Sequence, residues 1–274
     1  MIRGYADKWA LITGASSGIG AEFARRLAAR GMHLVLVARR RELMESLAQE
    51  LHTAHGTKCE IIVSDLGDPT QPPALYDDVK RRKIKVSLLI NNAGFGHVGQ
   101  ILETDVNRIH ELLRLNIEAL TDLTYRFLPD MIAAGEGGII NVSSVAAFQP
   151  VAYMGVYAAS KAYVLHFSEA LWAEAWDYGV TVMALCPGTT RTAFFDISGV
   201  KGWLNNKRAQ NVDQVVKTAL KAFDRRKQYV VSGWINYMLT LAVRIAMRRV
   251  AVRESMRYFR PAKRIEPGDV VEKR

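Results

Sequence analysis

Cysteine is scarce in this chain. It has two cysteines in 274 residues, Cys59 and Cys186, and both lie inside apolar strand-like runs. Two such residues cannot form the disulfide framework of a small secreted domain, and the sequence has no cysteine and histidine spacing typical of a zinc site. We therefore expect two buried free thiols and no bound metal.

Long apolar runs are also missing. No uninterrupted apolar run reaches the roughly 20 residues that a membrane-spanning helix needs. The run at 9–13 is too short for the core of a secretory signal. These absences predict a cytoplasmic protein, either soluble or peripheral to a membrane. Hydrophobic residues make up 49% of the chain, enough to build the core of one large α/β domain.

Strand-like and helix-like segments alternate along most of the chain. This alternation predicts an α/β fold, a single-domain Rossmann-type doubly wound parallel sheet of about seven strands with helices on both faces, over residues 1–232. Residues 233–274 are expected to form a basic amphipathic helical extension. The expected strands are 8–13, 33–38, 58–64, 86–91, 138–143, 180–186 and 228–231. The expected helices are 21–31, 40–55, one within 71–83, 105–134, 155–178, 213–225 and one from 234 onward.

A glycine-rich turn follows the first expected strand. Its sequence is Gly-Ala-Ser-Ser-Gly-Ile-Gly over 14–20, and a helical pattern comes next. A strand, a glycine turn and a helix together bring backbone N–H groups and a helix N-terminus towards a pyrophosphate. The glycine spacing is not the usual Gly-x-Gly-x-x-Gly, and a tight turn that binds nothing is the alternative.

Tyr157 and Lys161 are four residues apart in an expected helix. Residues at this spacing share one face of a helix. A free phenol has a pKa near ~10, and a nearby ammonium group favours its ionised form. We therefore expect Lys161 to lower the pKa of Tyr157, which makes the phenol a proton donor or acceptor near neutral pH. Taken alone, the pair is equally compatible with an ordinary surface helix.

Several motifs together resemble the short-chain dehydrogenase/reductase family, in its NADP-preferring form. Residues 13–20 resemble the coenzyme motif of that family, and 91–94, Asn-Asn-Ala-Gly, are similar to its second signature. Ser144 precedes Tyr157 by the family's thirteen positions, and Pro187-Gly188 resembles the loop that meets the nicotinamide. The resemblance covers residues 6–232.

The resemblance implies a role for each catalytic residue. Tyr157 is expected to exchange a proton with the substrate oxygen, and Lys161 to bind the nicotinamide ribose. Ser144 is expected to hold the carbonyl oxygen, since the adjacent Ser143 would face the other side of a strand. Asn116 is expected to support a water that links Lys161 to solvent, or else only to satisfy backbone groups of its helix.

The resemblance also implies a coenzyme site formed by residues that are distant in sequence. Besides Tyr157 and Lys161, its expected members are Gly14, Ser16, Ser17, Gly18, Ile19, Gly20, Arg39, Arg40, Asp65, Leu66, Asn92, Ala93, Gly94, Pro187, Gly188, Thr189 and Thr192.

The end of the second strand indicates which coenzyme is preferred. NAD-binding sheets usually carry an acidic residue there for the ribose 2′-hydroxyl. This chain has three arginines at 39–41 instead, and guanidinium groups hold phosphate well. The pattern favours NADP(H), with Arg39 the main contact, although the arginines would also suit a solvated helix start. Asp65 resembles the family's adenine contact, or alternatively caps the following turn.

The substrate is indicated only by large apolar side chains near the catalytic residues. A mobile substrate loop is expected over 189–206 by resemblance. A hydrophobic alcohol or ketone is expected, such as a steroid, a 3-oxoacyl chain or an aromatic ketone; alternatively, the aromatic residues only pack the loop. The expected substrate residues are Ser144, Phe148, Val151, Tyr153, Phe194, Phe195 and Trp203.

The basic charge is concentrated after residue 200. That part holds 18 Lys and Arg against 6 Asp and Glu, whereas residues 1–199 hold 19 against 21. Arginines at 244, 248, 249, 253 and 257 recur at nearly helical spacing beside an apolar stripe. Such a helix suits an anionic membrane, an acidic acyl carrier or coenzyme A, or a dimer contact. It also suits a helix that caps the core with its arginines in water. Nucleic acid is the least favoured partner, because no nucleic-acid-binding module is recognisable.

Two classes of function follow from these motifs. The first is an NADP(H)-dependent oxidoreductase that interconverts a carbonyl and a secondary alcohol. The second is a catalytically idle sensor or scaffold of the same fold. The presence of Ser144, Tyr157 and Lys161 together favours the enzyme, and the resemblance implies a homo-oligomer, either a dimer or a tetramer.

Overall fold

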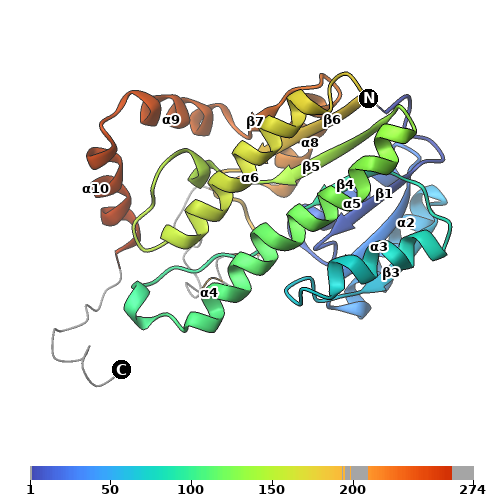
Figure 1. Ribbon diagram of the computed structural model, residues 1–274, viewed down its shortest axis with the longest axis horizontal. Coiled ribbons are helices and arrows are strands. Elements are labelled where there is room, and N and C mark those ends of the chain that lie inside the picture. The colour runs from blue at the N-terminus through green and yellow to red at the C-terminus, as the bar shows by residue number, and fades with distance from the viewer. Residues whose placement is uncertain (1, 193, 195–197, 199–208, 261–274) are drawn as a thin grey trace.

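A parallel sheet of seven strands forms the centre of the molecule, in the order β3-β2-β1-β4-β5-β6-β7. The computed structural model describes residues 2–192, 194, 198 and 209–260 (Figure 1). The chain order reverses between β1 and β4, so the predicted doubly wound sheet is confirmed. The strands are β1 (Trp9–Thr13), β2 (His33–Ala38), β3 (Cys59–Val63), β4 (Val86–Asn91), β5 (Gly137–Val142), β6 (Val180–Cys186) and β7 (Tyr229–Val231).

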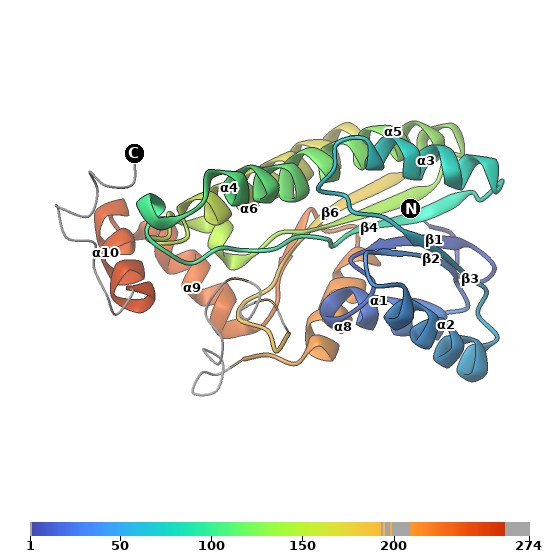
Figure 2. The ribbon, with the colours of Figure 1, turned by 90° about the horizontal axis from the view of Figure 1, so that it is seen from below.

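Helices cover both faces of the sheet (Figure 2). One layer contains α1 (Gly18–Ala28), α2 (Arg41–His55) and α8 (Val212–Phe223), and the other contains α3 (Gln71–Arg81), α4 (Val106–Leu113), α5 (Leu120–Ala133) and α6 (Gly155–Glu174). Side chains alternate between the layers: Ile12 packs with α1, whereas Leu11 packs with α5. Since both faces are covered, every residue of β6 is buried.

The segment predicted as one helix over 105–134 is divided by a wider turn. Residues Arg114–Ala119 form a π-helical turn between α4 and α5. Asn116 lies in this turn and is fully buried. Single π-turns inside α-helices are often found at functional sites, and this one brings Asn116 to the backbone of Phe95, behind the wall of the cleft described below.

The C-terminal segment differs from the prediction of one basic helix. It forms two helices, α9 (Trp234–Ile245) and α10 (Arg248–Phe259), and the two residues between them, Ala246 and Met247, have extended backbone. The helices meet in an L shape at one end of the molecule (Figure 1). The Oγ atom of Ser255 accepts a 3.0 Å hydrogen bond from the backbone of Ala152, so α10 is attached to the core. No helix in the described ranges is long and apolar enough to span a bilayer.

The two cysteines are free thiols, as predicted. Cys186 is buried, but Cys59 is only half-buried, because β3 lies at the edge of the sheet. Burial raises the pKa of Cys59 to about 11 and that of Cys186 to about 12, so both side chains are protonated at neutral pH.

Candidate active site

A cleft of about 1730 Å³ lies beyond the carboxyl ends of the central strands. Ligand sites for one small molecule are typically about 300–1,000 Å³, so this cleft has room for a dinucleotide and a second ligand. Its walls come from the glycine turn, the ends of β2, β4 and β5, the start of α6, the segment 187–192, and the two C-terminal helices.

The glycine turn has the geometry of an anion-binding loop. Gly14 and Gly18 have φ angles of 65° and 59°, a region that side chains other than glycine rarely adopt. A Cβ atom on Gly20 would lie 2.4 Å from the carbonyl oxygen of Gly14, so the start of α1 packs directly on the turn. Ser17 precedes α1 without a side-chain cap, which leaves the first N–H groups of the helix available to an anion. The turn therefore fits a pyrophosphate.

Thr13 joins the carboxyl ends of β1 and β4. Its hydroxyl oxygen accepts hydrogen bonds from the backbone N atoms of Asn92 at 3.0 Å and Ala93 at 2.9 Å. The Asn92 side chain donates in return to the carbonyl oxygen of Thr13 at 2.9 Å. Asn92 is thus occupied in holding two strand ends together. Thr13 belongs to the motif over 13–20, but this positioning role was not predicted from the sequence.

Arg40, rather than Arg39, lies against the glycine turn. Its guanidinium group donates to the hydroxyl oxygens of Ser16 and Ser17, both at 2.9 Å. Arg39 is 3.5 Å from the carboxylate of Asp65, and both side chains are largely exposed. Asp65 also accepts a 3.1 Å hydrogen bond from the backbone of Gly67, which is the turn-capping role considered as its alternative. Both arginines line the cleft beside a preformed anion site.

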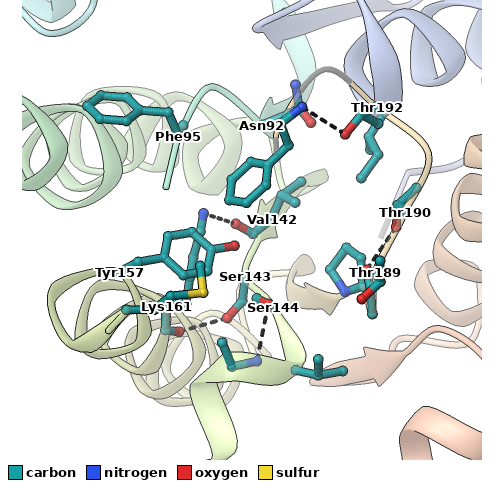
Figure 3. A pocket seen from close by; sticks show the side chains of 18 of the residues that line it. Asn92, Phe95, Val142, Ser143, Ser144, Tyr157, Lys161, Thr189, Thr190 and Thr192 are labelled. Atoms are coloured by element: carbon teal, nitrogen blue, oxygen red, sulfur yellow. Dashed lines mark hydrogen bonds between the residues drawn. The ribbon is translucent and has the colours of Figure 1, made fainter. Parts of the chain in front are cut away.

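Tyr157 and Ser144 lie close together on the cleft wall (Figure 3). Tyr157 is buried in α6, and Ser144 follows β5. Burial raises the pKa of Tyr157 to about 12, and a hydrogen bond with Ser144 opposes this rise. The hydroxyl of Ser143 points the other way and donates to the carbonyl oxygen of Lys161 at 2.7 Å. Only Ser144 of the pair is therefore placed beside the phenol.

The ammonium group of Lys161 does not lower the pKa of the phenol in this structure, contrary to the expectation from the sequence. Its Nζ atom lies 5.8 Å from the centroid of the Tyr157 ring and donates a 2.8 Å hydrogen bond to the carbonyl oxygen of Val142. Desolvation lowers the pKa of Lys161 to about 8. Because burial dominates for both groups, Tyr157 is a neutral phenol at pH 7 and can donate a proton.

Asn116 lies behind the cleft wall. Its Oδ1 atom accepts from the backbone N of Phe95 at 3.1 Å, and its Nδ2 atom donates to the carbonyl oxygen of Phe95 at 3.0 Å and to Ser160 at 3.1 Å. It therefore binds the backbone of a different segment, not that of its own helix. A Cβ atom on Gly94 would lie 2.9 Å from Asn116 Oδ1 and 3.5 Å from Lys161 Nζ, so these three residues are close neighbours.

The structure brings most of the expected ligand-binding residues to this cleft. The coenzyme residues at its wall are Gly14, Ser16, Ser17, Gly18, Ile19, Arg39, Arg40, Asp65, Leu66, Asn92, Ala93, Gly94, Tyr157, Lys161, Pro187, Gly188, Thr189 and Thr192. Gly20 does not line the cleft, because it packs against Gly14 where α1 meets the glycine turn.

The expected substrate residues divide into three groups. Val151 and Phe194 line the cleft, and the Phe194 ring lies 5.3 Å from that of Tyr157. Phe148 and Tyr153 do not line the cleft. The Phe148 ring packs 6.0 Å from Tyr229 instead. Tyr153 has a φ angle of 64° and does not line the cleft; its carbonyl oxygen accepts from the backbone of Gly99. Phe195 and Trp203 lie outside the described residues.

One wall of the cleft was not predicted from the sequence. Apolar side chains of the two C-terminal helices form it: Leu239, Ala242, Val243, Ala246, Val250, Ala251 and Phe259. Phe259 also packs with the buried cluster that contains Tyr157, Val151 and Met154. The apolar stripe of this segment was visible in the sequence, but nothing in its spacing indicated which part of the molecule it would cover.

Comparisons with known proteins agree with this geometry. The short chain dehydrogenase family model matches residues 8–199. The chain is similar to the short-chain dehydrogenase from Sphingobium yanoikuyae in complex with NADPH, with 35% identity, a TM-score of 0.79, and 94% of this chain and 98% of that chain covered. It is also similar to the bulky-bulky ketone specific alcohol dehydrogenase from Comamonas testosteroni, with 30% identity, a TM-score of 0.75, and 94% and 97% covered.

Several curated relatives are longer than this chain. The very-long-chain 3-oxoacyl-CoA reductase of Anas platyrhynchos is 32% identical over 196 residues, which are 69% of this chain and 62% of that protein. The match therefore spans less than two thirds of this relative.

Proposed function

Because the chain belongs to the short-chain dehydrogenase/reductase family, we propose that it is an NADP(H)-dependent oxidoreductase that interconverts bulky hydrophobic ketones and secondary alcohols. One observation carries the proposal: a buried phenol and a serine hydroxyl share a single large cleft with the glycine turn and with an apolar wall.

The choice of NADP(H) is supported by positive charge around the glycine turn. Arg40 is held at Ser16 and Ser17, next to the free N–H groups of α1. A 2′-phosphate there would receive charge-assisted hydrogen bonds. The carboxylate of Asp65 would not repel it strongly, since it is paired with Arg39. The NADPH in the Sphingobium relative supports the same choice.

The reaction follows from the positions of three side chains. A bound nicotinamide would supply the hydride. In the reduction direction the carbonyl carbon gains the hydride, and the carbonyl oxygen takes the phenol proton of Tyr157. Ser144 donates a hydrogen bond to the same oxygen as negative charge develops. Lys161, whose Nζ atom lies 5.8 Å from the centroid of the phenol ring, would bind the nicotinamide ribose. The resulting phenolate is restored by a proton from solvent.

The substrate class follows from the apolar wall. Val151 and Met154 pack with Tyr157, and α9 and α10 contribute further apolar side chains to the same cleft. A carbonyl placed at Tyr157 would thus lie in a large cleft with an apolar lining, which suits a ketone with bulky substituents. The similarity to the bulky-bulky ketone specific alcohol dehydrogenase from Comamonas testosteroni supports this class.

Two measurements on the purified protein test the proposal. Separate fluorescence titrations with NADPH and NADH are expected to show tighter binding of NADPH. Oxidation of NADPH is then followed at 340 nm in assays with ketones that have two, one or no bulky substituents. Tighter NADH binding would contradict the coenzyme assignment. Binding of NADPH without turnover of any ketone would favour a sensor or scaffold.

A further inference from the structure

The junction of α9 and α10 exposes an unusual amount of apolar surface. Nineteen large hydrophobic residues are exposed in the described part of the chain, and ten of them lie between 234 and 258. Of these ten, the most exposed are Ile245, at 89%, and Met247, at 77%, which lie at the break between the helices. We call residues 244–249 the elbow. Single exposed apolar residues are normal, but a concentration of this kind marks an interaction site.

Arginines precede and follow Ile245 and Met247 in the sequence. The segment 234–260 contains six arginines and a single acidic residue, Glu254. Glu254 is paired with Arg257 at 2.7 Å, whereas Arg248, Arg249 and Arg253 have no carboxylate partner within the part of the chain that the structure describes. Arg244 and Arg248 are the immediate neighbours of Ile245 and Met247 in sequence. The elbow thus combines two apolar side chains with a strong, unneutralised positive charge.

The elbow lies at the margin of the active-site cleft. Ala246 of the elbow lines the cleft, together with Val243 before it and Val250 after it. These side chains belong to the apolar wall of the cleft that Tyr157 also lines. A hydrophobic molecule at the elbow would therefore lie next to the wall of the catalytic cleft.

From these features we propose that the elbow docks on the surface of an anionic lipid bilayer. Ile245 and Met247 enter the interface, and the arginines bind the lipid phosphates. The two apolar side chains match the hydrocarbon of such a bilayer, and the arginines match its anionic surface. A second copy fits poorly, because a twofold contact through this patch would set arginines against arginines. An acidic soluble partner would use the arginines but would leave the two apolar side chains in water.

The docking explains how a poorly soluble substrate reaches the cleft. Ketones dissolved in the bilayer would enter along the wall formed by Val243, Ala246 and Val250. This second part rests on the proposed function, whereas docking itself does not.

Vesicle sedimentation of the full chain tests the proposal. We expect binding to vesicles of phosphatidylcholine mixed with phosphatidylglycerol, little binding to phosphatidylcholine alone, and weaker binding at high salt. Ile245→Ser with Met247→Ser should lower partitioning at least about tenfold. Each of Arg248→Gln, Arg249→Gln and Arg253→Gln should lower it about fivefold. No sedimentation with mixed vesicles, or unchanged sedimentation of the elbow variant, would overturn the proposal.

A matched control variant separates a local effect from a general one. Leu43→Ser with Arg81→Gln removes one exposed apolar and one exposed basic side chain from α2 and α3, far from the elbow. It should sediment like the unmodified chain. Equal loss in both variants, or concentration-dependent dimers that only the elbow variant loses, would also overturn the proposal.

An activity assay without vesicles separates this inference from the proposed function. The elbow variant should retain turnover of a water-soluble aromatic ketone with NADPH, because Ile245 and Met247 do not line the cleft. If no variant turns over any ketone, the proposed function fails while the sedimentation result stands. If turnover is intact and sedimentation is absent, docking fails alone.

Discussion

The ammonium group of Lys161 donates a 2.8 Å hydrogen bond to the carbonyl oxygen of Val142, in a site where no carboxylate opposes its charge among the described residues. A buried ammonium with one carbonyl acceptor is poorly solvated, which lowers the pKa of Lys161 to about 8. Burial of the Lys161 ammonium group therefore lowers the stability of the folded protein, as is common for residues of functional sites.

The first prediction concerns the pH dependence of stability. Between the folded pKa of about 8 and the ordinary value of 10.5, the unfolded chain binds a proton that the folded protein does not. The contribution of Lys161 to stability therefore rises with pH across this window. Between pH 7 and pH 10, the free energy of unfolding of the unmodified chain should therefore rise by about 2–3 kcal/mol relative to that of Lys161→Met.

Urea unfolding at pH 7, 8, 9 and 10 measures this difference. Lys58→Met, at an exposed position, controls for the loss of a lysine in general. A difference that stays constant for Lys161→Met over the whole pH range would show that Lys161 is not desolvated as the structure indicates.

The second prediction separates the two adjacent serines. Ser144→Ala should lower kcat about 10²–10³-fold, because it removes the donor to the developing oxyanion. Tyr157→Phe should lower kcat about 10²–10⁴-fold, since it removes the proton donor. Neither change should weaken NADPH binding much, so that fluorescence titration together with steady-state kinetics tests both.

Ser143→Ala is the matched control for Ser144→Ala. It removes the 2.7 Å hydrogen bond to the Lys161 carbonyl oxygen and should mainly lower stability, by about 1 kcal/mol. A loss of kcat for Ser143→Ala equal to that for Ser144→Ala would reverse the assignment.

The third prediction concerns the two arginines at the end of β2. Arg40 is already positioned at Ser16 and Ser17, whereas Arg39 is drawn towards Asp65. Arg40→Ala should therefore raise the KM for NADPH more than Arg39→Ala does, by roughly ten- to a hundredfold, given about 1.5–3 kcal/mol for a hydrogen bond to a charged group. Kinetics with NADH should change little in both variants. Equal effects on NADPH and NADH would argue against a 2′-phosphate contact.

The strands and the parallel, doubly wound class of the sheet could be predicted from the sequence, because local patterns indicate them. Runs such as Leu34–Ala38 and Val182–Cys186 are apolar throughout, as expected for strands covered on both faces. Motif spacing likewise singled out Ser144, Tyr157 and Lys161, which line one cleft, since residues that follow parallel strands meet at one edge of the sheet.

The rest depends on tertiary contacts that leave no periodic signal. The direction of the pKa shift of Tyr157 follows from burial, not from its spacing to Lys161. Phe148 lies between Ser144 and Tyr157 in sequence, yet it packs away from the cleft because Tyr229 of β7 offers it a partner. The break between α9 and α10 at Ala246 and Met247 could not be predicted from the sequence, since neither residue disrupts a helix by itself.

The last prediction tests how α9 is joined to the loop after β6. A Cβ atom on Gly188 would lie 2.2 Å from Nδ2 of Asn236. Asn236 has little freedom to move, because Nδ2 donates to the carbonyl oxygen of Ser232 at 2.7 Å and to Gln210 at 3.3 Å. Gly188→Ala should thus displace α9 and lower the free energy of unfolding by about 1–3 kcal/mol.

A double-mutant cycle identifies the cause. Asn236→Ala removes the obstructing amide, so Gly188→Ala should cost less in that background, with a coupling energy of about 0.5 kcal/mol or more. Gly155→Ala is the control, since a Cβ atom there would meet nothing within 4 Å. Strictly additive losses would mean that Gly188 is required for its backbone conformation alone. A measurable coupling would instead show that α9, and with it the apolar wall of the cleft, is held in place by close approach to the loop beside the catalytic residues.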